Sequence, residues 1–225
     1  MRIAISKFHD AVASLRRTIG RLSLVSGVAF ASLAAVPDVA SAQTLASLPN
    51  VPSAISTAGA ARPISAWVTF CETYAAECAV NAAEPATITL TPGIWNTIVS
   101  VNRRVNKSIR AVTDMEQLGV ADRWDLAESG AGDCEDFQLL KRKFLAEAGL
   151  PRRAMRMTVV IDEKGEGHAV LTLITDRGDL VLDNKTNNVL PWRQTGYTFI
   201  KRESQSSMAW VSLGRAASPV TTANR

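Results

Sequence analysis

The strongest local pattern in the chain is Gly130-Ala131-Gly132-Asp133-Cys134-Glu135-Asp136, which leads into an apolar repeat that ends at Gly149-Leu150-Pro151. The apolar residues recur three and four apart, as on one face of a helix, and Gly followed by Pro is a typical helix end. The pattern therefore predicts a helix from about Cys134 to Ala148. In the first turn of a helix, unpaired N–H groups and the helix dipole favour a thiolate over a thiol. We therefore predict that Cys134 is an activated nucleophile.

The first 42 residues have the layout of a bacterial secretory signal peptide. Five basic residues lie within residues 1–21, an apolar run extends from Leu22 to Val36, and Ala40-Ser41-Ala42 is a small-residue cleavage site. This layout is typical of a leader that is removed on export. We expect a periplasmic protein that starts at Gln43; an uncleaved membrane anchor is the alternative.

The net charge of +4 comes mostly from this leader. The chain has 25 basic and 21 acidic residues, of which the leader holds five and two, so 20 and 19 remain. A nearly neutral chain lacks the excess of basic residues that is typical of nucleic-acid binding, so we expect no nucleic-acid partner. The remaining 183 residues (225 minus 42) are enough for one domain with its own core, and no later segment is able to span a membrane.

The rest of the chain divides into a linker, a domain and a tail. Residues 43–62 are rich in Ala, Ser and Pro without a period and are predicted to be a flexible linker, and residues 215–225 a disordered tail. The domain, residues 63–214, begins with two helical patterns. One runs from Pro63 towards Cys78, and a long amphipathic one follows the cap signal Thr91-Pro92-Gly93.

After Pro151 the pattern changes from helical to extended. Strands are predicted at Met155–Asp162, His168–Thr175, Leu180–Asn184, Tyr197–Glu203 and Met208–Leu213. Residues 163–167 and 176–179 predict the hairpin turns between them. Helices first and an antiparallel sheet second predict an α+β fold in which the cysteine helix packs on the sheet.

The few cysteines and histidines limit which residues can act as nucleophile and base. In an exported chain Cys71 and Cys78 are expected to form a disulfide; two buried free thiols are the alternative. That bridge leaves Cys134 as the free thiol. His9 falls in the leader, so His168 is the imidazole available to accept a proton from Cys134, although a histidine at a hairpin end is often a surface residue.

A third group usually orients the base of such a pair, and two residues are candidates. Asp183 interrupts an apolar strand, where an acid either faces solvent at the strand end or has a partner. With a two-residue turn at Arg177-Gly178, Asp183 would lie opposite Thr172, and Asn187 opposite His168. Spacing alone leaves both Asp183 and Asn187 open, because Asp183 needs a differently placed turn or a bulge.

In combination, several motifs resemble the bacterial transglutaminase-like cysteine proteinase family, whose best-known members are the LapG-type periplasmic proteases. The motifs are Gly132–Asp136, Gly167–Leu171 and Val181–Asn184, with Phe70-Cys71, Glu77-Cys78, Trp124-Asp125 and Pro191-Trp192 around them. The resemblance covers roughly residues 63 to 203. It implies a papain/transglutaminase-like fold and a Cys-His-Asp triad of Cys134, His168 and Asp183.

The resemblance also implies an activity. LapG-type enzymes are endopeptidases that cut large surface adhesins at a paired-alanine site, which disperses biofilm. They need calcium, and an inner-membrane receptor for cyclic-di-GMP sequesters them. Their calcium site uses the two acids that flank the cysteine, here Asp133 and Glu135. Acids in a first turn also complement the helix dipole without any metal, but carboxylates beside a thiolate oppose it, and a bound hard cation would cancel their charge.

Three other functions fit the same residues. A transglutaminase would pass the acyl group from Cys134 to an amine, which incorporation of a labelled amine would reveal. A peptidoglycan amidase or peptidase would release fragments from muropeptides. A non-catalytic scaffold would bind its partner equally well after Cys134→Ala.

Overall fold

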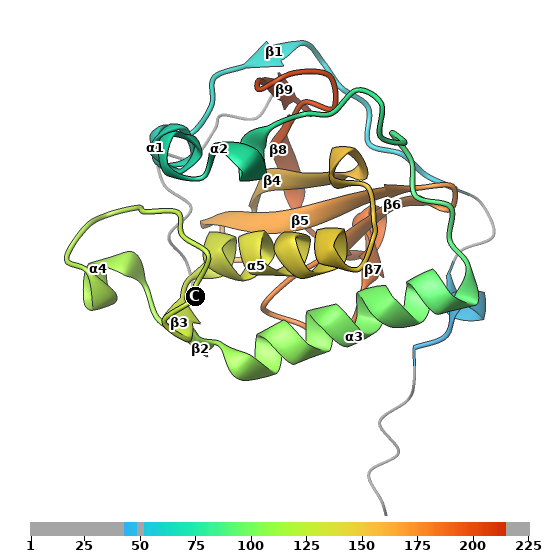
Figure 1. The fold of residues 1–225 in the computed structure, drawn as a ribbon, viewed down its shortest axis with the longest axis horizontal. Coiled ribbons are helices and arrows are strands. Elements are labelled where there is room, and N and C mark those ends of the chain that lie inside the picture. Colours follow the sequence, from blue (N-terminus) through green and yellow to red (C-terminus); the bar gives the residue numbers. More distant parts are fainter. Residues whose placement is uncertain (1–42, 49–51, 215–225) are drawn as a thin grey trace, which may run out of the picture. The chain divides into compact units, whose positions relative to one another are not determined.

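The computed structural model describes residues 43–48 and 52–214, and the predicted signal peptide (1–42) and tail (215–225) lie outside them (Figure 1). The described chain forms an antiparallel sheet of seven strands in the order β1-β9-β8-β4-β5-β6-β7. These strands are β1 (Ala60–Ala61), β4 (Met155–Ile161), β5 (Gly167–Thr175), β6 (Gly178–Leu182), β7 (Leu190–Pro191), β8 (Thr198–Glu203) and β9 (Trp210–Ser212).

The α-helices lie between β1 and β4 in sequence. They are α1 (Ser65–Thr73), α2 (Ala75–Cys78), α3 (Pro92–Ser108), α4 (Asp114–Gln117) and α5 (Cys134–Glu147), with the short 3-10 turns η1 (Leu45–Ser47), η2 (Arg152–Ala154) and η3 (Trp192–Gln194). α5 lies along β4 and β5, and α3 packs beside α5 (Figure 1). This arrangement confirms the predicted α+β fold. None of the described helices is long and apolar enough to cross a membrane.

Apolar side chains cover both faces of the sheet. Leu171 and Leu173 of β5 belong to the main core, which also contains residues of α3 and α5. Val170, the residue before Leu171, belongs to a smaller cluster with Ile55 and Phe199. Because successive residues of a strand point to opposite faces, this alternation fixes the register of β5 and with it the position of His168 at the start of the strand.

The long helix α3 begins where the cap signal predicts. Thr91 has an extended backbone, and its side-chain oxygen accepts a hydrogen bond from the backbone N–H of Ile94 at 3.2 Å. Pro92 occupies the first helical position, where its missing N–H has no intrahelical partner to lose. The cap aligns the buried face of α3, including Trp95 and Ile98, with α5.

The predicted disulfide between Cys71 and Cys78 is present, but the predicted single helix is interrupted. α1 ends at Thr73, Tyr74 adopts φ −117° and ψ 56°, and α2 starts at Ala75. In one continuous helix, residues seven apart would be separated by roughly 10 Å along the axis, too far for a disulfide. The break at Tyr74 brings the two Cα atoms to 5.6 Å, so the bridge and a continuous helix are incompatible.

The described parts of the predicted linker, residues 43–48 and 52–62, lie against the domain rather than apart from it. Gln43 accepts a hydrogen bond from Val189 N at 2.9 Å through its side chain and one from Trp95 Nε1 at 3.0 Å through its carbonyl. Ile55 is buried, and its N–H donates to Asp179 Oδ2 at 2.9 Å. The sequence did not predict these contacts, because the residues that make them follow neither helical nor strand spacing within this Ala-, Ser- and Pro-rich segment.

Candidate active site

Cys134 is the first residue of α5, as the sequence predicts. The short strand β3 (Ala131–Gly132) ends just before Cys134, with Asp133 between them, and pairs in parallel with β2 (Arg110–Ala111), which fixes the direction from which the chain enters the helix. A Cβ on Gly132 would overlap the side chain of Asp136, so this tight entry requires glycine. The Cys134 side chain is fully buried.

The sulfur of Cys134 lies against the first turn of α5 and the start of β5. Its Sγ accepts a hydrogen bond from the backbone N–H of Ala169 at 3.3 Å and lies 3.2 Å from Glu135 Oε2. Ala169 directly follows His168, so the structure brings the predicted thiol and the predicted imidazole together. No disulfide involves Cys134, in agreement with the predicted free thiol.

His168 is buried, unlike a surface histidine at a hairpin end. Its Nε2 lies 2.9 Å from Asp183 Oδ1, and because an ionised carboxylate can only accept, Nε2 carries the proton of this bond. Burial lowers the pKa of His168, but the charge of Cys134 and hydrogen bonds to Asp183 and Cys134 outweigh burial and raise the pKa to about 9. The imidazolium form is therefore favoured at neutral pH.

Asp183 is placed by a hairpin turn that differs from the one considered in the sequence analysis. Thr175 pairs with Gly178, so Asp176 and Arg177 form the turn, and Thr172 faces Val181 rather than Asp183. Gly178 has φ +93°, a conformation that glycine adopts readily.

The same register continued one residue past β6 sets Asp183 opposite Val170. Asp183 is thus a diagonal neighbour of His168 on one face, and no bulge is required. Asn187, the other candidate, instead accepts a hydrogen bond from Asn106 Nδ2 at 3.2 Å.

The structure adds two groups that the sequence did not single out around Asp183. Tyr197 OH donates to Asp183 Oδ2 at 2.7 Å, and its ring packs edge-on against the His168 ring with centroids 5.7 Å apart. The backbone N–H of Lys185 donates to Asp183 Oδ1 at 3.1 Å. Burial raises the pKa of Asp183, but the hydrogen bond and charge of His168 and these donors outweigh it and lower the pKa to about 2.

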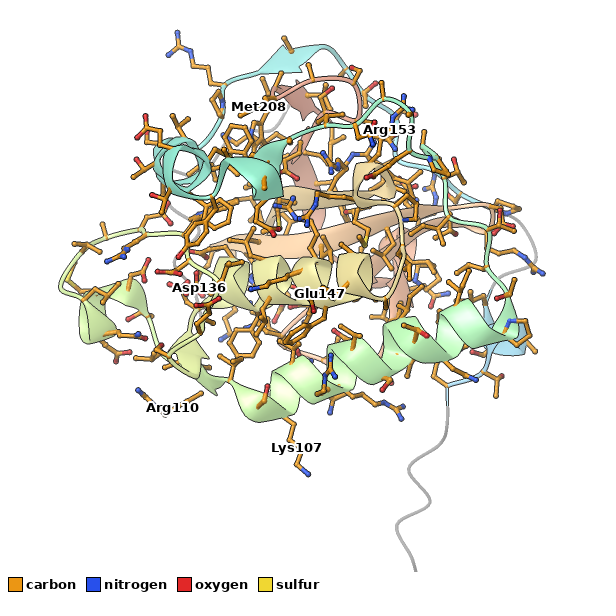
Figure 2. All side chains as sticks on the ribbon, in the orientation of Figure 1. Lys107, Arg110, Asp136, Glu147, Arg153 and Met208 are labelled. Carbon is orange, nitrogen blue, oxygen red and sulfur yellow. A yellow bond between two sulfur atoms is a disulfide. The ribbon has the colours of Figure 1, made fainter. Side chains whose placement is uncertain are left out.

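Five carboxylates gather at the N-terminal end of α5, where Figure 2 shows Asp136. Oxygen atoms of Asp114, Asp122 and Glu135, and likewise of Asp114, Asp133 and Asp136, lie within 4.8 Å of one another. The predicted metal residues Asp133 and Glu135 are both members. Asp114 and Asp122 were missed because they are distant in sequence and follow no local pattern with Cys134.

The carboxylate cluster (Asp114, Asp122, Asp133, Glu135 and Asp136) has the properties of an oxygen-ligand metal site. Burial, followed by the neighbouring acids, raises the pKa of Asp136 to about 9. Burial also raises the pKa of Asp133 to about 7, although a hydrogen bond with Glu135 opposes the rise. Asp133 Oδ1 and Glu135 Oε1 are buried and meet no hydrogen-bond donor among the described residues. Buried carboxylates without donors fit a hard cation such as Ca²⁺.

Two clefts adjoin this cluster on either side of residues 123–125. One of about 270 Å³ is lined by Phe70, Tyr74 and Trp124, among others. The other, of about 310 Å³, is lined by Tyr74, Asp114 and Asp136, among others. The segment between the clefts is anchored to the cluster, since the Asp125 N–H donates to Asp136 Oδ1 at 2.7 Å.

A buried cysteine at a helix start, beside a histidine and an aspartate of an antiparallel sheet, is the arrangement typical of papain- and transglutaminase-like thiol enzymes. Residues 57–218 match the family model of the bacterial transglutaminase-like cysteine proteinases, and the chain belongs to this family of cysteine peptidases. Among curated proteins, none matches the chain.

Solved structures with a similar fold include LapG of Legionella pneumophila. The calcium-bound form is 22% identical with a TM-score of 0.47, over 57% of this chain and 74% of that chain. A second LapG structure and an EGTA-treated one are each 24% identical with a TM-score of 0.43 over 48% of this chain; they are covered over 63% and 62% of their length, respectively.

Proposed function

We propose that the protein is a cysteine endopeptidase with Cys134 as nucleophile, His168 as acid and base, and Asp183 as the group that orients His168. The observation that carries the proposal is the placement of the three groups: Cys134 Sγ accepts from the N–H of Ala169, the residue after His168, and His168 Nε2 lies 2.9 Å from Asp183 Oδ1. Membership of a cysteine proteinase family supports it.

In the proposed reaction the Cys134 thiolate attacks the scissile carbonyl carbon, and the carbonyl oxygen takes the negative charge. The Cys134 backbone N–H, at the start of α5, is an available donor to that oxygen because first-turn N–H groups have no partner within the helix. The His168 imidazolium then protonates the leaving amine, which breaks the C–N bond and leaves an acyl-enzyme. Neutral His168 next removes a proton from water, whose oxygen attacks the acyl carbon and releases Cys134.

We also propose that Asp133 and Glu135 hold Ca²⁺, with Asp114, Asp122 and Asp136 as further candidate ligands. The raised pKa values of Asp133 and Asp136 and the unpaired buried carboxylate oxygens support a cation at this position. A bound Ca²⁺ would neutralise carboxylates that otherwise oppose a negative charge on Cys134.

The substrate and location follow from the family resemblance. We propose a protein substrate, specifically a large cell-surface adhesin cut at a paired-alanine site to release cells from biofilm. An inner-membrane receptor for cyclic-di-GMP is the proposed regulator. Residues 1–42 are proposed to direct export to the periplasm and to be removed there, and residues 215–225 to be a disordered tail.

The proposal is tested by comparing wild type with Cys134→Ala. Mass spectrometry of surface proteins released from cells should identify a protein cut between two alanines with wild type and not with the variant. The purified enzyme should cut the same protein, and EGTA should stop the cleavage. Amine incorporation without cleavage would identify a transglutaminase instead, and equal release by both forms would refute a role for Cys134.

A further inference from the structure

Two residues of α5 lie on the same helical face as Cys134, four and seven positions further on: Gln138 and Lys141. Both side chains are fully buried. A buried lysine is unusual, because removing an ammonium from water is costly unless it is paired and hydrogen-bonded. Burial lowers the pKa of Lys141 to about 7, while the charge of Asp183 acts in the opposite direction. The Asp183 carboxylate of the proposed triad therefore acts on Lys141.

Lys141 also determines how Gln138 is oriented. Lys141 Nζ donates to Gln138 Oε1 at 3.2 Å, and Gln138 Nε2 donates to Asn184 Oδ1 at 3.4 Å. A glutamine amide can turn either its oxygen or its nitrogen to a given neighbour. An ammonium can only donate, so it attracts the oxygen and leaves the nitrogen to face Asn184.

The loop after β6, which carries Asp183 and Asn184, receives a second anchor from α3. Asn106 Nδ2 donates to the backbone oxygens of Asp183 and Thr186, each at 2.9 Å. Asn106 holds the backbone, and Gln138 holds the side chain next to Asp183. Asp183 lies just beyond the last residue of β6, so the paired ladder of the sheet ends before it. The contacts from the helices therefore add to those that Tyr197 and His168 make with its carboxylate.

We infer that Lys141 and Gln138 are positioning residues that hold the loop of Asp183, and through it the ring of His168, in place for the reaction. The inference rests on the proposed cysteine peptidase function. The ammonium of Lys141 orients the Gln138 amide, the amide fixes Asn184, and Asp183 is thereby set at hydrogen-bonding distance from His168. Neither positioning residue contacts the substrate.

The test compares Lys141→Met with Lys201→Met in the full chain. Lys201 is also buried, but its Nζ donates to the Arg62 carbonyl at 2.9 Å, outside the proposed triad. Methionine preserves most of the volume and removes the charge, and replacing a buried charge by an apolar side chain is often neutral or stabilising. We expect Lys141→Met to keep the wild-type melting temperature and KM while kcat falls on the order of tenfold, as for a displaced catalytic group. Lys201→Met should keep the wild-type kcat.

A second measurement needs no substrate. The ¹H NMR signal of the His168 Nε2 proton, assigned by its loss in His168→Gln, should shift or broaden in Lys141→Met and stay unchanged in Lys201→Met. In addition, Gln138→Leu should lower kcat, and the double variant should lose no more than the worse single variant, because the two residues act in series.

Wild-type kcat and an unchanged His168 signal in Lys141→Met would overturn the inference. A fall in kcat that merely follows a fall in melting temperature would also overturn it, since that result indicates a structural role alone. If wild type itself cleaves nothing, the proposed function fails, and the NMR comparison still decides whether Lys141 positions His168.

Discussion

Two opposing effects determine the charge of His168: its burial and its charged neighbours. Burial disfavours the imidazolium, while Cys134 and Asp183 favour it strongly enough to raise the pKa to about 9. A folded-state pKa above the ordinary 6.5 means that this interaction stabilises the fold fully below about pH 6.5 and is lost as the pH rises through about 9. The imidazolium needed to protonate a leaving amine therefore persists through neutral pH.

Asp183→Asn tests this balance. The amide oxygen still accepts from Nε2–H, as in the Cys-His-Asn arrangement of other thiol proteases, but the negative charge is gone. We expect the pKa of His168 to fall, so the alkaline limb of the kcat/KM profile moves to lower pH. Asp183→Ala also loses the acceptor and should reduce kcat/KM on the order of a further hundredfold. A limb that stays near pH 9 in Asp183→Asn would show that Asp183 does not set the charge of His168.

Among the elements, the β5–β6 hairpin determines where Asp183 lies. Gly178, the first residue of β6, is constrained in two ways. Its φ is +93°, and a Cβ there would lie 2.5 Å from Ser53 N and 2.6 Å from Ser53 O. The segment that the sequence presented as a linker therefore packs directly on the hairpin that carries the proposed triad residue, and Asp179 N donates to Ser53 O at 2.9 Å.

Gly178→Ala should destabilise the protein far more than Gly165→Ala. Gly165, in the β4–β5 turn, has a similar φ of +83°, but nothing lies within 4 Å of its would-be Cβ. The conformational cost alone is about 1–2 kcal/mol, and forcing the Ser53 backbone away adds about 1–3 kcal/mol at Gly178. Urea unfolding of both variants measures the difference. Equal losses of unfolding free energy in the two variants would mean that the Ser53 backbone moves away from the added Cβ at no energetic cost.

A buried network joins α1, α5, β4 and β8 through Glu203. This carboxylate accepts hydrogen bonds from Arg142 Nη1 at 2.7 Å, Trp67 Nε1 at 2.7 Å and Met157 N at 2.9 Å. Burial raises the pKa of Glu203, but the positive charges of Arg142 and Arg156 outweigh burial and leave the pKa below its ordinary value. The contribution of the ion pair to stability is therefore present at neutral pH and is lost as the pH falls through that lowered pKa.

Glu203→Gln should destabilise the fold by about 3–5 kcal/mol, the usual cost of leaving a buried partner uncompensated. Glu128→Gln is the matched control, because Glu128 pairs with Lys143 at 3.2 Å at the surface, where such pairs contribute about 0–1 kcal/mol. Chemical denaturation of both variants at pH 7 gives the comparison. A loss in Glu203→Gln no larger than in Glu128→Gln would contradict the assigned role of the network.

The sequence predicted what local patterns encode. Cys134 at a helix start, the cap at Thr91 and the hairpins each depend on residues within a few positions of one another. Contacts between distant elements escaped prediction: Tyr197 reaches Asp183 from the position just before β8, and Asp114 joins the carboxylate cluster from 19 positions before Asp133. The sequence left the register of the β5–β6 hairpin open because several two-residue turns fit the same stretch, and packing of Ser53 on Gly178 helps to determine which one forms.

For the whole molecule, the carboxylate cluster brings together several acids at the N-terminal end of α5. Asp133, Glu135 and Asp136 have raised pKa values because burial and mutual repulsion oppose their ionised forms. At neutral pH without a cation, the fold must either bind protons at these sites or carry repulsive charge. The folded chain should therefore gain stability from any hard cation that the cluster accepts.

Calcium should raise the melting temperature of wild type, and removing a carboxylate should have opposite effects with and without it. At a calcium concentration 100 times the Kd, binding adds about 2.7 kcal/mol to the free energy of unfolding. Asp133→Asn removes one buried charge, so in EGTA the variant should melt at or above the wild-type temperature, while its calcium-induced rise should be lost. Magnesium should raise the melting temperature of wild type less than calcium does, because it demands a tighter octahedral shell.

Calorimetry in EGTA, Ca²⁺ and Mg²⁺ distinguishes these cases. The control is Asp176→Asn, which lies outside the cluster and should respond to calcium as wild type does. If calcium left the wild-type melting temperature unchanged, or if Asp133→Asn melted lower in EGTA and kept the full calcium response, the cluster would be a set of buried acids without a metal.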